Sequence, residues 1–146
     1  FHGKQAYGAV LANWLLRSIQ AHYENTPYPD ALAPVPLHRH RLRQRGYNQS
    51  MLIALQLSRQ LNIPIMTEGI YRRINTVPQA TLPSKQRQKN VNQAFAIHNA
   101  FTDQHIAIID DVMTTGHTVN ALAKALKKNG AKRVSVWAIA RGRLSR

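Results

Sequence analysis

The sequence of 146 residues contains no cysteine. This absence excludes disulfide scaffolds, cysteine zinc sites, thiol nucleophiles and cysteine-ligated iron–sulfur clusters. Acidic residues are also scarce: 6 Asp and Glu stand against 20 Lys and Arg, which gives a formal net charge of +14 and argues against acidic calcium-binding modules. Of the 20 basic residues, 13 are arginine, the side chain that binds phosphate in a bidentate manner. The excess predicts a polyanionic partner, a phosphorylated ligand, or both.

The sequence also lacks a long hydrophobic run. The near-apolar stretch at residues 9–16 is interrupted by Asn13 and followed by Arg17. It is too short to span a bilayer and does not have the pattern of a signal peptide, so we expect no membrane span and a cytoplasmic location. The length suits one domain, and a hydrophobic content of 44% is typical of a globular chain. Because the chain starts with Phe1 rather than Met, we expect the natural start to lie upstream.

Strand-like and helix-like segments alternate in the second half of the chain. Residues 105–110 contain an unbroken apolar run, which is typical of a strand covered on both faces of a parallel sheet. A helix over 118–128 and a strand over 133–140 complete the signature of a right-handed β-α-β unit. We therefore predict an α/β fold with a central, mostly parallel sheet flanked by helices. Upstream, the pattern predicts helices over 6–23 and 48–61, strands over 32–36 and 94–98, one or two strands within 65–75, and a long loop over 75–92.

Hydrophobic periodicity also predicts which side chains form the core. We interpret Trp14 and Trp137 most simply as core residues. The apolar face predicted for the first helix consists of Val10, Trp14, Leu15 and Ile19. The second helix, which Asn48 would cap, has an apolar face predicted from Met51, Leu52, Leu55 and Leu57.

The segment most informative about chemistry is residues 106–119, IAIIDDVMTTGHTV. An apolar strand ends in Asp110 and Asp111, and a turn rich in threonine then opens a helix. Ligands of open α/β sheets bind outside the carboxyl ends of the strands, and the N–H groups at a helix N-terminus suit a phosphate. The candidate phosphate-binding residues are Thr114, Thr115, Gly116, His117 and Thr118.

The two neighbouring acids, Asp110 and Asp111, are harder to explain by structure alone. Like charges repel, so a partner must offset their proximity; two sugar hydroxyls, or a magnesium ion shared with them, would do so. A helix cap explains one Asp or one Thr, but it does not explain two acids, three threonines and a glycine within nine residues. A phosphate-binding turn beside acids that bind hydroxyls predicts a site for a ribose 5-phosphate. We expect no metal site formed by protein side chains alone.

Segment 106–119 resembles the 5-phosphoribosyl-1-pyrophosphate (PRPP) motif of type I phosphoribosyltransferases. The chain as a whole resembles the phosphoribosyltransferase domain of the ComF/GntX family, which is linked to DNA uptake in natural competence. The stretch VPLHRHRLRQRGYNQS, residues 35–50, is similar to the basic loop of that family, which ends in Arg-Gly-aromatic-Asn-Gln. Members usually carry a four-cysteine zinc module upstream, whereas we expect residues 1–146 to form a single phosphoribosyltransferase-like domain without it.

The resemblance implies a role for each matching position. Asp110 and Asp111 would hold the ribose 2- and 3-hydroxyls, and residues 114–118 would hold the 5-phosphate. Mg²⁺ would bind together with PRPP. The loop after the first strand would face the pyrophosphate through Leu37, His38, Arg39 and Arg45. The 75–92 loop would close over the site, with candidates Gln79 and Arg87. Proteins of DNA uptake are expected partners, and a homodimer is considered as well.

The alternating arginines of residues 39–45 leave two interpretations open. They form a solvated basic loop or an anion site for pyrophosphate or single-stranded DNA, for which Arg41, Arg43 and Tyr47 are the candidates. Tyr47 either stacks on a base or packs under the loop. The leading function is phosphoribosyl transfer to an acceptor that the sequence does not name. The alternative is a non-catalytic module of the competence machinery that senses PRPP or binds single-stranded DNA, and a scaffold role rests on the resemblance alone.

Overall fold

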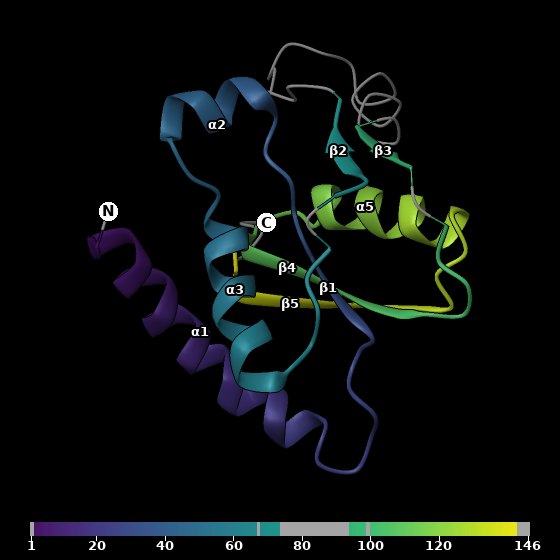
Figure 1. The fold of residues 1–146 in the computed structure, drawn as a ribbon, viewed down its shortest axis with the longest axis horizontal. Helices are drawn as coiled ribbons and strands as arrows, with labels where there is room; N and C mark the ends of the chain where they lie inside the picture. Colours follow the sequence, from purple (N-terminus) through teal and green to yellow (C-terminus); the bar gives the residue numbers. More distant parts are fainter. Residues whose placement is uncertain (1, 67, 74–93, 99, 143–146) are drawn as a thin grey trace.

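A parallel sheet with helices on both faces forms the centre of the protein (Figure 1). The computed structural model describes residues 2–66, 68–73, 94–98 and 100–142. The elements in chain order are α1 (His2–His22), β1 (Ala31–Pro34), α2 (Arg39–Arg45), α3 (Gln49–Leu61), β2 (Ile70–Arg72), β3 (Phe95–Ile97), β4 (His105–Met113), α5 (His117–Lys128) and β5 (Arg133–Arg141). Strand β4 pairs in parallel with β1 and β5, and β2 pairs antiparallel with β3. This arrangement confirms the predicted α/β fold.

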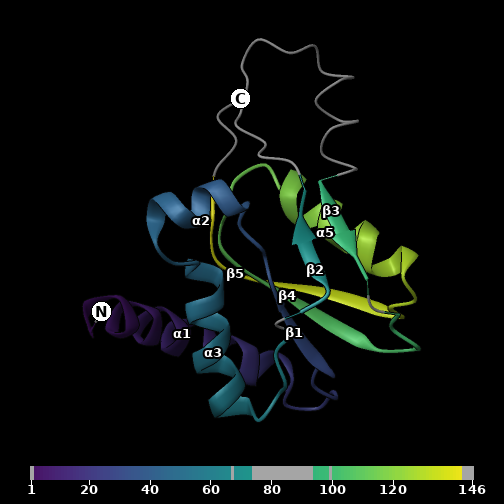
Figure 2. The ribbon, with the colours of Figure 1, turned by 45° about the horizontal axis from the view of Figure 1, so that its top comes forward.

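The apolar run of β4 is covered on both sides, as the sequence predicts. Ile106 and Ile108 belong to the core shared with α5 and β3, while Ala107 and Ile109 belong to the core shared with α1 and α3. Successive side chains of a strand point to opposite faces, so one strand supplies both cores. Figure 2 shows α1 and α3 on one side of the sheet and α5 on the other.

The predicted apolar face of α1 is wrong for Val10 and Trp14, whereas Ile19 is buried and Leu15 packs against the core as predicted. Trp14 is 74% exposed and Val10 is 56% exposed, whereas Ala12 and Ile19 are buried. The reason is a close approach of α1 to α3 along the small residues of α1, since a Cβ added at Gly8 would lie 3.0 Å from Leu52 Cβ. The helices meet where their backbones can come close, and Val10 and Trp14 are left exposed. Trp137, by contrast, lies in the core as predicted.

The basic segment predicted as a loop contains the short helix α2. The side chain of His38 caps its start by accepting a hydrogen bond from the backbone N–H of His40, and Gly46 ends it with φ of 73°. The helix places Arg39 with Arg43 and Arg41 with Arg45 at i,i+4 spacing, so each pair of like charges lies on one face of α2. The prediction of a basic loop was therefore wrong for residues 39–45, which are helical.

Helix α3 begins where the sequence predicts, but of its predicted apolar face only Leu57 is fully buried. The side chain of Asn48 accepts a hydrogen bond from the backbone N–H of Met51, which confirms the predicted cap. The buried residues of the helix are Ser50, Ile53, Ala54 and Leu57, while Leu55 is exposed. The buried stripe thus includes a serine, and hydrophobicity alone did not predict it.

Strand β4 continues past the two aspartates to Met113, whereas the sequence predicts its end at Asp110. Strand β5 stays paired with it up to Met113 and Arg141, but β1 ends at Pro34. Pro34 and Pro36 have no backbone N–H, so β1 cannot extend its ladder there. Beyond Ile109, β4 therefore has a neighbour on one side only.

The predicted 75–92 loop lies outside the described residues, and no described helix is long and apolar enough to cross a membrane.

Candidate functional site

The site begins at Asp110, at the point where β4 loses β1 as its neighbour. Asp110 as a whole residue is 9% exposed, and the hydroxyl of Ser50 donates a hydrogen bond to its Oδ1 over 3.3 Å. The backbone N–H of Asp111 donates to the same oxygen over 3.0 Å. Strand β4 and the first turn of α3 thus hold this carboxylate in a fixed position.

Burial raises the pKa of Asp110 from its ordinary value of 3.8 to about 6. This value includes the charge of Asp111, which also raises the pKa, and the hydrogen bond from Ser50, which opposes the increase. The two carboxylates are therefore within electrostatic reach of each other, although they are neighbours on one strand. A cation or hydroxyl donors at this position would favour the charged form of Asp110.

The turn between β4 and α5 leaves a helix N-terminus without a side-chain cap. Gly116 occupies the N-cap position with φ of 77° and ψ of 0° and has no side chain to cap the helix, while Thr115 Oγ1 accepts a hydrogen bond from the backbone N–H of His117 over 3.5 Å. Glycine meets the conformational requirement, because L side chains rarely adopt positive φ. Uncapped N–H groups at the positive end of a helix are suited to an anion.

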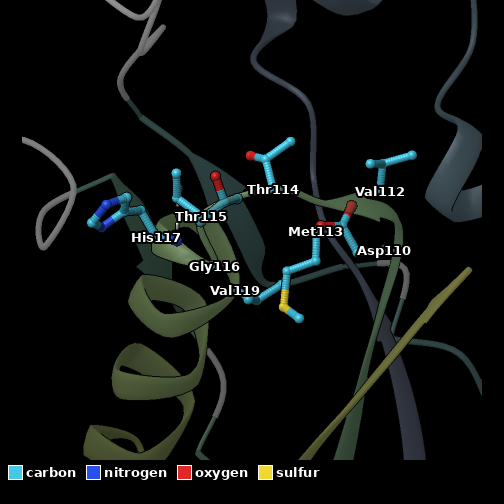
Figure 3. A pocket seen from close by; sticks show the side chains of 9 residues that line it. Asp110, Val112, Met113, Thr114, Thr115, Gly116, His117 and Val119 are labelled. Atoms are coloured by element: carbon cyan, nitrogen blue, oxygen red, sulfur yellow. Dashed lines mark hydrogen bonds between the residues drawn. The ribbon is translucent and has the colours of Figure 1, made fainter. Parts of the chain in front are cut away.

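Asp110 and the turn line one small pocket of about 40 Å³. The rest of its lining is residues 112–119, which include Thr114, Thr115, Gly116, His117 and Thr118. A volume of about 10–15 Å³ holds one water, so the pocket has room for a compact polar group. Figure 3 shows the carboxylate of Asp110 on the side of Thr114, while the ring of His117 projects away from Asp110. Asp111 is half-buried and is not among the lining residues.

The structure does not bring the predicted pyrophosphate residues to this pocket. Leu37 and His38 are half-buried between β1 and α2, whereas Arg39 and Arg45 are exposed on α2. Arg45 donates a hydrogen bond to Gln49 Oε1 over 3.2 Å.

The other predicted contacts lie elsewhere. Arg43 is exposed on α2, and Arg41 and Tyr47 are half-buried. Gln79 and Arg87 lie outside the described residues. In the part of the chain that the structure describes, no group of three or more His, Asp or Glu could hold a metal ion.

Two residues of the site were missed by sequence reasoning. Ser50 is 60 positions away from Asp110 in the sequence, so no local pattern predicts their contact. Arg72 on β2 is half-buried, its guanidinium carbon lies 5.7 Å from the centre of the Phe95 ring, and the charge of Asp110 acts on its pKa. A single arginine in a short strand of alternating polar and apolar residues does not by itself predict a functional residue.

Comparisons with known proteins agree with this geometry. A family model described as "Phosphoribosyl transferase domain" matches residues 48–146. Competence protein F of Haemophilus influenzae is 41% identical, over 77% of this chain and 51% of its own length. DNA utilization protein YhgH of Escherichia coli K12 is 39% identical, over 77% of this chain and 50% of its own length. The chain thus spans about half the length of these curated relatives.

A solved structure extends the likeness to the fold. The crystal structure of a purine phosphoribosyltransferase from Pyrococcus horikoshii aligns with a TM-score of 0.55 at 22% identity. The alignment covers 92% of this chain and 73% of that chain. At this level of identity, the likeness concerns the fold alone.

Proposed function

This chain belongs to the phosphoribosyltransferase domain family, within the ComF/GntX group that its sequence resembles, and we propose that it binds PRPP at the carboxyl end of β4. The observation that carries the proposal is the single pocket shared by a buried carboxylate and an uncapped helix N-terminus. The carboxylate can accept hydrogen bonds from hydroxyl groups, and the helix N-terminus can bind an anion. A ribose 5-phosphate carries both hydroxyl groups and an anionic phosphate.

The proposed contacts follow from the chemistry of each group. The 5-phosphate accepts hydrogen bonds from the N–H groups of the first turn of α5 and from the hydroxyls of Thr114, Thr115 and Thr118. Asp110 and Asp111 accept hydrogen bonds from the 2- and 3-hydroxyls of the ribose. The hydrogen bond from Ser50 supports this role, because it favours the charged form of Asp110, the form that accepts two hydrogen bonds.

Mg²⁺ fits this donor set. Asp110 and Asp111 offer the hard oxygen ligands that Mg²⁺ prefers, and this ion commonly takes one or two carboxylates together with oxygens of a substrate phosphate. When bound, Mg²⁺ supplies positive charge that neutralises a pyrophosphate leaving group. A buried carboxylate with a raised pKa also suits the ion, because a cation lowers the free energy of the charged form.

The proposed reaction is displacement at C1 of the ribose. The bond from C1 to the pyrophosphate oxygen breaks, the electron pair leaves with pyrophosphate, and an acceptor atom bonds to C1. The chain contributes mainly by position and charge, since fixed donors and cations stabilise a transition state in which charge is separated. Arg39 and Arg45 are the proposed charge partners of the leaving group, and Asp111 is the nearest candidate base for a proton of the acceptor.

We further propose a role in DNA uptake. The relatives are named as competence and DNA utilization proteins, and the chain carries a net charge of +14. The same charge, together with exposed Arg39, Arg43 and Arg45 on α2, favours a second candidate function: a module that binds single-stranded DNA and keeps the PRPP pocket as a sensor.

One set of measurements separates the two functions. The purified chain is incubated with PRPP, Mg²⁺ and candidate acceptors while pyrophosphate release is followed. Release that is lost in Asp110→Asn and Asp111→Asn supports the transferase. PRPP binding without release, together with binding of labelled single strands that weakens steeply with salt, supports the module. If millimolar PRPP with Mg²⁺ leaves the melting temperature unchanged, both versions of the proposal are wrong.

A further inference from the structure

The chain between β1 and α3 is tied together at its base by one side chain. Residues 36–47 leave the end of β1, form α2 and return to the start of α3 (Figure 1). The side chain of Asn48 closes this excursion, since its Nδ2 donates a hydrogen bond to the carbonyl of Val35 over 3.0 Å. Its Oδ1 accepts from the backbone N–H of Met51 and so caps α3. Asn48 therefore fixes the start of α3 to the end of β1.

Two further hydrogen bonds connect this junction to β4. The backbone N–H of Val35 donates to the carbonyl of Ile109 over 2.9 Å. In the first turn of α3, the hydroxyl of Ser50 donates to Oδ1 of Asp110 over 3.3 Å. Because Ile109 and Asp110 are consecutive on β4, these two bonds and the Asn48 side chain complete a closed ring. The ring joins β1, α3 and β4 at the carboxyl edge of the sheet.

This hydrogen-bond ring is largely shielded from water. Val35, Ser50 and Asp110 are buried, and Asn48 is half-buried. A buried polar group that loses its partner is costly, and a buried network whose members are all satisfied holds one arrangement. The ring therefore fixes the position of Asp110 relative to β1 and α3.

The ring also determines which oxygen of Asp110 can meet a ligand. Ser50 and the backbone N–H of Asp111 both donate to Oδ1, and no described backbone N–H or hydroxyl donates to Oδ2. Asp110 lines the small pocket of the proposed ribose site, whereas Asn48 and Ser50 do not. Figure 3 shows the carboxylate on the side of Thr114. Two donors on one oxygen thus leave the other oxygen to accept from a ligand in that pocket.

The chemistry of asparagine explains its presence at position 48. Serine, threonine, aspartate and asparagine all cap helices by accepting a hydrogen bond from a backbone N–H. An ionised aspartate cannot donate, and serine and threonine carry their hydroxyl one bond closer to the backbone, whereas the asparagine amide donates and accepts from two separate atoms. A cap alone does not select asparagine, but a cap that also bonds Val35 does.

We propose that Asn48 and Ser50 are positioning residues for Asp110, which hold its carboxylate so that Oδ2 faces the ribose hydroxyls. Neither side chain contacts the ligand. The proposal rests on the proposed PRPP site for its purpose, but the positioning itself can be measured without PRPP. It gives residues 48–50 of the stretch VPLHRHRLRQRGYNQS a role in the site that does not involve binding an anion.

The first measurement follows hydrogen exchange of the Asp111 amide by NMR in the ligand-free chain, because this N–H donates to Asp110 Oδ1. Asn48→Ser keeps a capping hydroxyl but removes the donor that reaches Val35. We expect the Asp111 amide to exchange about tenfold faster in Asn48→Ser and in Ser50→Ala. An unchanged rate in Asn48→Ser would overturn the proposal.

Asn129→Ser is the matched control. Asn129 also donates from its side-chain amide to a backbone carbonyl, that of Ala125 over 2.8 Å, but at the C-terminal end of α5. Its loss should lower stability by a comparable amount and leave the exchange rate of the Asp111 amide within about twofold of wild type. An equal acceleration in Asn129→Ser and Asn48→Ser would show that general destabilisation is responsible, and the proposal would be wrong.

The second measurement is the affinity for PRPP with Mg²⁺. Ser50→Ala and Asn48→Ser should each weaken binding about tenfold, and Asn129→Ser less than about twofold. The double variant Asn48→Ser/Ser50→Ala should lose little more than either single variant, because both changes act on one carboxylate. Fully additive losses, or losses no larger than in the control, would contradict the closed ring. If wild type does not bind PRPP, the proposed function is wrong, and the exchange rates still decide whether Asn48 and Ser50 position Asp110.

Discussion

Replacing Asp110 by Asn should stabilise the ligand-free protein above pH 6. The carboxylate is buried beside Asp111, and its pKa is raised from an ordinary value of 3.8 to about 6. Below pH 3.8 it is protonated in both the folded and the unfolded chain, so its ionisation costs nothing. Between pH 3.8 and about pH 6 the folded chain holds a proton on Asp110 that the unfolded chain has lost, so the free energy of unfolding falls as pH rises.

The magnitude follows from the size of the shift. A difference of about two pKa units, at about 1.4 kcal/mol each, sets an upper bound of about 3 kcal/mol. Because part of the carboxyl group still meets solvent, we halve this figure to about 1.5 kcal/mol. For a chain of 146 residues the unfolding entropy is about 0.3 kcal/mol per degree, so Asp110→Asn should raise the melting temperature by about 5 °C at pH 7.5.

The assay is thermal unfolding followed by circular dichroism, from pH 4 to pH 8 at constant ionic strength. The side-chain amide introduced by Asp110→Asn retains an oxygen that can accept the hydrogen bonds from Ser50 and from the N–H of Asp111. Asp103→Asn is the control, because this aspartate is exposed and asparagine tolerates its φ of 56°. A gain that is the same at pH 4 and pH 8, or a loss at both, would refute the electrostatic reasoning.

Four further substitutions test the site and the core. Ser50→Ala removes the hydrogen bond to Asp110, so unfolding should become easier by about 1 kcal/mol and the pKa of Asp110 should rise above about 6. Carboxyl NMR titration measures this rise, and an unmoved titration would contradict it. Gly116→Ala should cost about 1–2 kcal/mol in urea unfolding, because φ is 77°. The nearest atom to the added Cβ would be 3.7 Å away, so the cost comes from backbone strain and not from a clash. A much larger loss of stability would contradict this explanation. Trp14→Ala should cost less than about 0.5 kcal/mol and Trp137→Ala about 3–5 kcal/mol, and similar losses would contradict the observed burial.

Features encoded by short stretches of sequence were predicted well. The apolar run of residues 106–109 predicts a strand buried on both faces, and β4 supplies both cores. Asn48 caps α3 as expected, and Gly116 occupies a backbone conformation that favours glycine. Each of these signals depends on a few neighbouring residues and on backbone geometry that any fold must respect.

Features that depend on contacts between distant segments were not predicted. The apolar pattern of α1 places Trp14 inside, but the close approach of Gly8 to Leu52 turns the small side of the helix toward α3. The contact of Ser50 with Asp110 joins residues 60 positions apart, and it exists only because the start of α3 lies at the carboxyl edge of the sheet. Periodicity measures the hydrophobicity of a face, whereas packing also depends on how closely two backbones can approach.

The unfavourable features of this protein are concentrated at one edge of its sheet. Within ten residues, Asp110 is buried next to a second acid, α5 begins without a side-chain cap, and Gly116 holds a positive φ. A serine or aspartate at the N-cap would stabilise the helix, and a neutral side chain at position 110 would remove the electrostatic cost. Such costs persist where a ligand offsets them. An anion at the α5 N-terminus and hydroxyls or a cation at Asp110 would offset the uncapped helix and the buried charge, and both groups occur together in a magnesium-bound sugar phosphate.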